Sequence, residues 1–145
     1  MKHSLSYDFY LKWTIRYSIA PILICLFCLG IVIFDPSLWP IYVIGIVIII
    51  IIFLPFILFM FLHLRRAKKA EDDVNVFEGR IIKLEPEMTF TFKSYLKAYV
   101  EIHDKGKFIV ETYPVLDSKK YENLKDKEVQ VSYEKGKKAF ILMIL

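Results

Sequence analysis

The chain has 145 residues with a formal net charge of +4, and 56% of its residues are hydrophobic, which allows one small domain beside any membrane segment. The excess of positive over negative charge lies in the first 70 residues, because residues 71–145 contain 13 Lys or Arg and 14 Asp or Glu, a net charge of −1. Since no basic stripe with interleaved aromatic side chains is present, we expect no nucleic-acid partner.

The N-terminal segment, residues 1–16, mixes aromatic and aliphatic side chains with Asp8, Lys12 and Arg16. Two interpretations remain open for it. It forms either a short interfacial helix that continues into the apolar region that follows, or a simple aromatic-rich flank.

Residues 17–64 are almost entirely apolar and predict a transmembrane helical hairpin, with spans at 17–34 and 41–62 and an outer turn at 35–40. A helix rises about 1.5 Å per residue, so roughly 20 residues cross a hydrocarbon core of about 30 Å. The rest of the chain is too short to cover both helices in a water-soluble protein. We expect the first span to be retained rather than cleaved as a signal peptide, because a second span follows it directly.

Basic residues flank the hairpin at its open end, whereas the outer turn carries only the acidic Asp35. The positive-inside rule therefore predicts a multi-pass protein of the cell (inner) membrane with both termini in the cytoplasm. Residues 65–73 form a basic juxtamembrane linker. The residues expected to set this topology and to lie near lipid headgroups are Lys12, Arg16, Arg65, Arg66, Lys68 and Lys69.

The spans themselves contain no charged side chain and no histidine, which argues against a transporter or a pump, and more weakly against a channel. Cys25 and Cys28 form a C-x-x-C pair on one helical face, and we interpret them as structural because cysteine is readily buried. Pro55 lies inside the second span and predicts a kink there.

From residue 74 onward the pattern is that of β-strands. Apolar residues alternate with polar ones from Phe90 and Phe92 to Ile102, which predicts one long strand, bent or bulged near Lys93. The predicted strands are 76–85, 90–102, 108–113, 128–133 and 139–145, with hairpin turns at 103–107 and 134–137. We also expect a bulge at Gly79, strand ends at Pro86 and Pro114, and a single helical turn within 117–124.

Five strands leave too few residues for a helical layer, so we expect the sheet to curl on itself into a small OB-like or SH3-like β-barrel. The predicted fold is thus an α+β membrane protein: a two-helix transmembrane hairpin followed by a five-stranded cytoplasmic barrel, residues 74–145. The final run, residues 140–145, is apolar on both faces. Either the barrel and its linker satisfy both faces, or a membrane-proximal helix, a second copy or a partner covers the outer face, and Ile141, Met143 and Leu145 form an interface.

Three features of the second half define a pattern of strand starts and turns: residues 78–82 opening the domain, the turn at 104–107, and residues 124–131 leading to the last hairpin. This pattern resembles the NfeD family of bacterial membrane proteins, which carry an OB-fold tail. The resemblance covers residues 76–145. It implies a non-enzymatic accessory role in organising or binding a membrane partner.

No pattern of catalytic or cofactor-binding residues is present. His3, His63 and His103 are scattered, and the isolated glycines make no phosphate loop. Glu85 and Glu87 are interpreted as a solvated turn rather than an acid/base pair. We therefore predict no enzymatic activity, no cofactor, no metal and no small-molecule substrate.

Two functions fit these observations. The first is a membrane-anchored interaction or scaffold protein, whose β domain binds a protein partner, packs into a membrane assembly or forms a homo-oligomer. The alternative is a small immunity protein that protects against a membrane-active toxin through its spans or its outer turn. The richness in Ile, Lys, Phe and Tyr suggests a bacterial source.

Overall fold

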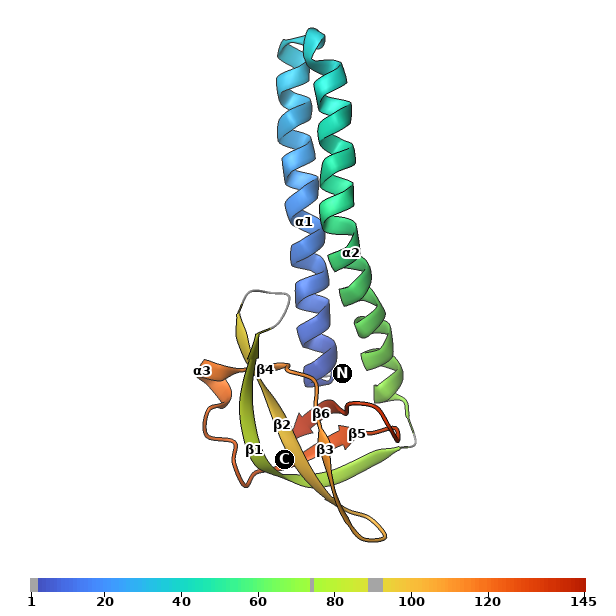
Figure 1. Cartoon of the computed structure of the whole chain (residues 1–145), viewed down its shortest axis with the longest axis vertical. Helices are drawn as coiled ribbons and strands as arrows, with labels where there is room; N and C mark the ends of the chain where they lie inside the picture. Colours follow the sequence, from blue (N-terminus) through green and yellow to red (C-terminus); the bar gives the residue numbers. More distant parts are fainter. Residues whose placement is uncertain (1–2, 74, 89–92) are drawn as a thin grey trace.

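The computed structural model describes residues 3–73, 75–88 and 93–145. It consists of a long helical hairpin that stands on a β-sheet (Figure 1). The hairpin is made of α1 (Leu5–Phe34), the short 3-10 helix η1 (Pro36–Leu38) and α2 (Trp39–Glu71). Both long helices have the length and apolar composition needed to cross a membrane.

The turn between the helices is specified by its own residues. The side chain of Asp35 accepts hydrogen bonds from the Ser37 backbone N–H at 3.1 Å and from the Ser37 hydroxyl at 2.6 Å. Pro36 follows at the first position of η1, where its missing N–H costs nothing. The two predicted helices and the turn between them are therefore present, although α1 begins at Leu5 and so includes most of the N-terminal segment.

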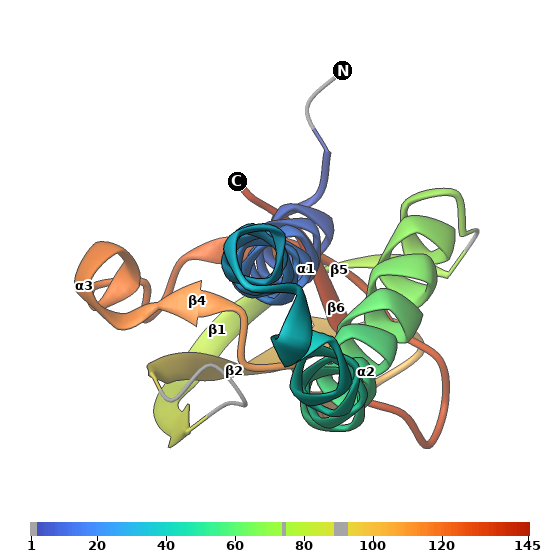
Figure 2. The ribbon, with the colours of Figure 1, turned by 90° about the horizontal axis from the view of Figure 1, so that it is seen from above.

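The two helices run side by side near the turn and diverge toward the sheet (Figure 1). Pro55, at the middle of α2, lacks the N–H that would bond to the carbonyl of Ile51. Seen along the hairpin, α1 stands over the sheet while the lower part of α2 swings out to one side (Figure 2).

The sheet has six strands, all paired antiparallel in the order β3-β2-β1-β5-β6, with the short β4 pairing beside β2. The strand bounds are β1 Val76–Met88, β2 Ser94–His103, β3 Lys107–Glu111, β4 Leu116–Asp117, β5 Glu128–Ser132 and β6 Phe140–Ile144. A single helical turn, α3 (Ser118–Tyr121), follows β4 as predicted.

The five-stranded barrel expected from the sequence is wrong in this form, because the sheet has a sixth strand and is not closed. The outer strands β3 and β6 do not pair, and the chain joins them only at an isolated parallel bridge between Thr112, just after β3, and Ala139, just before β6. There the Ala139 N–H donates to the Glu111 carbonyl at 2.9 Å, and the Tyr113 N–H donates to the Ala139 carbonyl at 3.1 Å. Beyond this bridge, the start of α1 lies against β6, and the Ser6 hydroxyl bonds to a backbone group of β6 that a further strand could otherwise pair with.

Two local predictions in the first hairpin of the sheet are also corrected, and a third lies outside the described residues. β1 continues through Pro86, which pairs with Leu96 of β2. On its other side β1 pairs with β5 only over 76–80, so no described strand there needs the N–H that Pro86 lacks. The bulge lies between Ile81 and Lys83 rather than at Gly79. β2 begins at Ser94, and the predicted strand positions Phe90 and Phe92 lie outside the described residues.

The core of the sheet follows the predicted alternation. Leu96, Ala98, Val100 and Ile102 of β2 are all buried, and they pack with residues of β1, β5 and β6. Both predicted hairpin turns form, with Gly106 and Gly136 at positive φ angles of 134° and 82°. The alternation predicts these strands correctly because one face of each is buried in the same core.

Candidate functional site

The junction between the helices and the sheet is built by the first three turns of α1. Ser6 is fully buried, and its hydroxyl donates to the Ile141 carbonyl at 3.0 Å and accepts from the Ile141 N–H at 2.9 Å. On the same helix, Phe9 and Trp13 contact the ring of Tyr95 edge-on, at centroid distances of 4.9 and 6.5 Å. The N-terminal segment therefore lies on the sheet, and Trp13 is buried in this contact.

A second tie joins the start of α1 to the end of α2. Ser4 caps α1 by accepting from the Tyr7 N–H at 3.1 Å, and its own N–H donates to the Glu71 carboxylate at 2.7 Å. A carboxylate that bonds the N-cap N–H normally comes from the third residue of the same helix, whereas here α2 provides it. Burial raises the pKa of Glu71, but the hydrogen bonds from Ser4 and His3 outweigh it, so that this pKa lies below its ordinary value.

Replacing the hydroxyl that joins α1 to β6 tests how much the junction depends on it. Ser6→Ala leaves the buried N–H and C=O of Ile141 unpaired, and we expect a loss of about 2 kcal/mol in unfolding free energy. Amide hydrogen exchange at Ile141 and urea unfolding in detergent micelles measure this loss. Ser18→Ala in the same helix is the matched control, because its hydroxyl only adds a second bond to a helical carbonyl. Equal stability of the two variants would contradict the role assigned to Ser6.

A basic cleft of about 680 Å³ opens between the end of α2 and the turn that joins β5 to β6. Its charged lining residues are Arg66, Lys69 and Asp73 on the α2 side and Glu134, Lys137 and Lys138 on the turn side. Arg66 and Lys69 face the cleft together because they are three residues apart on one face of α2, and Asp73 follows just beyond the end of the helix. Four cations thus surround a space that two carboxylates only partly neutralise.

The cations of the basic cleft differ in how they are paired. The Lys137 ammonium lies 2.7 Å from the Glu134 carboxylate, and the Lys138 ammonium lies 3.5 Å from that of Glu111. Neither Arg66 nor Lys69 has a carboxylate within 4.0 Å among the residues that the structure describes. On the α2 side of the cleft, Arg66 and Lys69 therefore form no ion pair with a described residue, although Asp73 lines the same side.

The six residues expected near lipid headgroups are all exposed, but they do not form one cluster. Arg66 and Lys69 line the basic cleft. Arg16 lies 4.9 Å from the Trp13 ring and Arg65 lies 5.7 Å from the Phe61 ring, so both guanidinium groups stack on aromatic side chains of their own helices. The remaining members of this set are Lys12 and Lys68.

The predicted interface residues of β6 are divided between the core and the surface. Ile141 is fully buried, whereas Met143 and Leu145 are 47% and 49% exposed. The side chains of Met143 and Leu145 can therefore contact a partner directly, whereas that of Ile141 cannot. Of the covers that the sequence left open for β6, the structure shows a membrane-proximal helix, the start of α1. The sequence pattern missed the part that Lys137 and Lys138 play in the cleft. The only sequence signal for this part is the basic character of the predicted 134–137 turn.

The two edges of the sheet are not equivalent. At the β6 edge, Ser6 occupies both backbone groups of Ile141. At the β3 edge, residues 107–110 pair with β2 on one side and with no described strand on the other, and Ile109 there is 60% exposed. An unpaired edge with an exposed apolar side chain can add a strand from another chain.

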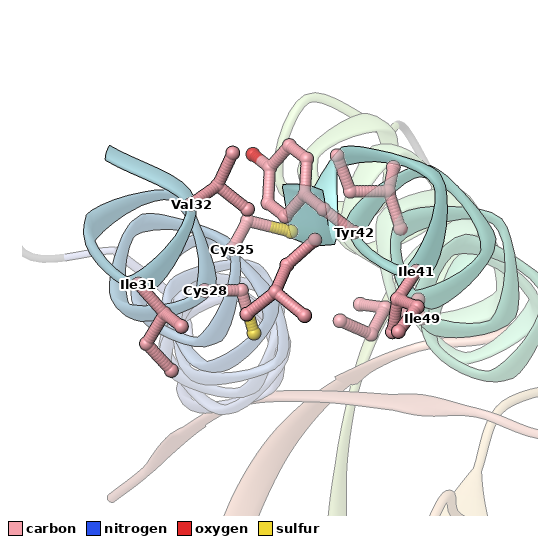
Figure 3. A pocket seen from close by; sticks show the side chains of 10 residues that line it. Cys25, Cys28, Ile31, Val32, Ile41, Tyr42 and Ile49 are labelled. Carbon is pink, nitrogen blue, oxygen red and sulfur yellow. The ribbon is translucent and has the colours of Figure 1, made fainter. Parts of the chain in front are cut away.

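Cys25 and Cys28 line a small cavity of about 210 Å³ between the two helices. Figure 3 shows them facing Ile41, Tyr42 and Ile49 of α2 across this space. Both cysteines are free thiols, and no group of three or more His, Cys, Asp or Glu side chains among the described residues is arranged to hold a metal ion. The surroundings of the C-x-x-C pair are those of helix packing.

Glu85 and Glu87 belong to a charge cluster on the sheet rather than to a turn. The Lys97 ammonium lies 2.8, 3.7 and 3.9 Å from the carboxylates of Glu111, Glu87 and Glu85, respectively. Hydrogen bonding from Lys97 lowers the pKa of Glu111, and hydrogen bonds from Lys83 and Tyr99 lower that of Glu85. Carboxylates with lowered pKa values stay ionised at neutral pH, so these groups are suited to ion pairing and poorly suited to supply a proton.

Comparisons with protein-family models, with curated proteins and with solved structures find no match to this chain. The resemblance of residues 76–145 to the NfeD tail therefore stays a prediction. The features that bear on function are the apolar surface of the helices, the tied junction, the open β3 edge and the basic cleft.

Proposed function

We propose that this chain is a non-enzymatic, membrane-anchored interaction protein with two spans in the cell (inner) membrane and both termini in the cytoplasm. The observation that carries the proposal is the outward apolar surface of the hairpin, where Phe27, Ile33 and Ile51 are 72%, 71% and 66% exposed. A protein in water rarely exposes a continuous apolar surface of this extent, whereas a bilayer covers it. The core of the sheet is closed by its own strands and by the ends of the helices that lie on it, so the sheet needs no such cover.

The sheet is held at a fixed position on the hairpin, as expected of a scaffold rather than of a tethered domain. Ser6 joins α1 to β6, and Glu71 joins the end of α2 to the start of α1. We further propose that the sheet is an incompletely closed OB-like barrel, as the NfeD resemblance implies. The strand order β3-β2-β1-β5-β6 and the parallel bridge beside the outer strands support this proposal.

The proposed contact surface for a protein partner is the open edge of β3, centred on Ile109. Strand addition at such an edge provides backbone hydrogen bonds for affinity and side-chain contacts for specificity. The exposed residues Met143 and Leu145 near the C-terminus form a second, smaller candidate surface.

The experiment places a photo-crosslinking amino acid at Ile109, and separately at Met143, in the full chain within intact membranes. We expect one discrete crosslinked product from Ile109, and its loss when the nearby Lys107 is replaced by Pro to block strand addition. A crosslinker at Lys125, an exposed residue outside the strands, is the control. No discrete product at either test position, or the same products at Lys125, would overturn the proposal of a partner.

Topology is tested separately with a reporter fused after Leu145. We expect activity of a reporter that works only in the cytoplasm. Activity of one that works only outside would reverse the proposed orientation.

A further inference from the structure

We propose that the basic cleft between α2 and the β5–β6 turn binds the phosphate group of an anionic phospholipid. This inference rests on the proposed membrane anchoring, because it is the bilayer that brings headgroups to the cleft. The ligand chemistry is a phosphate ester with net negative charge. A free phosphate in solution shares this chemistry, and the experiment below separates the two sources.

The charges of the cleft suit such a ligand. Arg66 and Lys69 are exposed cations on adjacent turns of α2 and have no carboxylate partner among the described residues. Arginine presents a planar fork of N–H donors that matches phosphate oxygens, and lysine adds a point charge. Across the cleft, Lys137 pairs with Glu134 and Lys138 pairs with Glu111. These carboxylates position the two ammonium groups, and each ammonium retains N–H donors for a second acceptor.

The lining also contains polar groups that can complete the coordination of a phosphate. The hydroxyl-bearing residues Tyr113 and Ser132 both line the cleft, and Ser132 is almost fully buried. Gly136 at the turn leaves the approach open, because no atom lies within 4 Å of the position that a side-chain carbon would occupy there.

The depth of the cleft favours a lipid as the source of the phosphate. Arg66 and Lys69 follow the predicted end of the second span, Leu62, by four and seven residues, which corresponds to about 6 and 10 Å along a helix. The headgroup layer on each side of a bilayer is about 5–8 Å thick. Arg66 therefore lies within that layer and the side chain of Lys69 reaches back to it.

The experiment compares two double variants of the full chain that remove the same charge. Arg66→Gln with Lys69→Gln removes both cations from the α2 side of the cleft. Arg65→Gln with Lys68→Gln removes two neighbouring exposed cations that do not line the cleft. All four positions are exposed, so circular dichroism and the thermal midpoint are expected to be unchanged in both variants.

Lipid binding is measured by native mass spectrometry of the detergent-purified protein, titrated with phosphatidylglycerol or with phosphatidylcholine. We expect the cleft variant to bind phosphatidylglycerol about tenfold more weakly than the unaltered protein, and the control variant to change by less than about threefold. Phosphatidylcholine, which has no net charge, is expected to bind weakly to all three proteins. Equal losses in the two variants, or no loss in either, would overturn the cleft as a lipid site.

Inorganic phosphate is the second arm. We expect millimolar phosphate neither to raise the thermal midpoint nor to displace phosphatidylglycerol. Displacement that disappears in the cleft variant would assign the cleft to a soluble phosphate instead of a lipid. Carbonate extraction of membranes tests the premise independently: release of the unaltered protein would overturn both membrane anchoring and the lipid assignment. A membrane-embedded protein whose variants bind lipid equally would overturn the lipid assignment alone.

Discussion

Gly79→Ala is expected to lower the unfolding free energy of the sheet by about 3 kcal/mol or more. A side-chain carbon at this position would lie 2.5 Å from the Val100 Cγ1 atom and 2.8 Å from the Glu101 backbone oxygen. The second of these atoms belongs to the paired strand itself, so no rotamer change relieves the contact. β1 and β2 would have to separate where Gly79 pairs with Ile102. Glycine here permits close approach of two strands, a role different from the bulge that the sequence suggested.

The measurement is urea unfolding of the full chain in detergent micelles. Gly136→Ala and Gly45→Ala are the matched controls, because nothing lies within 4 Å of the new carbon at either position. We expect a loss of about 1 kcal/mol for Gly136→Ala, which comes from its positive φ alone, and no loss for Gly45→Ala inside α2. A Gly79→Ala protein as stable as Gly136→Ala would contradict the close strand approach.

The parts of the fold that the sequence predicts are those set by local periodicity. The helical hairpin follows from two uninterrupted apolar runs, and β2 follows from the alternation that ends at Ile102. What the sequence leaves open is which surface each apolar face meets. A hydrophobic pattern cannot distinguish whether Phe9 and Trp13 face lipid or pack against Tyr95, because both environments are apolar.

The candidate site depends on contacts between distant parts of the chain, and these are invisible to a local pattern. Ser6 bonds to Ile141, a residue 135 positions away, so the sequence near either residue does not indicate that they are paired. The same holds for the basic cleft. Arg66 and Lys69 are predicted as membrane-proximal cations, but Lys137 and Lys138 join them only because the β5–β6 turn folds back beside α2. The open sheet has the same origin, since α1 takes the place beside β6 that barrel closure would otherwise need.

Ile141→Ala is expected to cost about 3 kcal/mol, because it opens a cavity at a fully buried position. Ile141 pairs with Val131 of β5 and belongs to the core that β1, β2 and β5 share. Trp13 is a suitable reporter for urea unfolding in a Trp39→Phe background, because it is buried against the sheet while Trp39 is exposed at the far end of the hairpin. Ile141→Val, which removes one methyl group, is expected to cost about 1 kcal/mol.

Met143→Ala on the same strand is the control that separates folding from association. Its side chain is half exposed, so in monomeric protein we expect a loss below about 1 kcal/mol. A loss equal to that of Ile141→Ala under those conditions would contradict the burial that distinguishes the two residues. Charged substitutions at Ile141 cannot test an interface, because a lysine there would unfold the sheet whether or not a partner exists. Only a variant at Met143 or Leu145 leaves the core intact, and an effect there that appears in membranes but not in monomeric protein therefore measures contact with another chain.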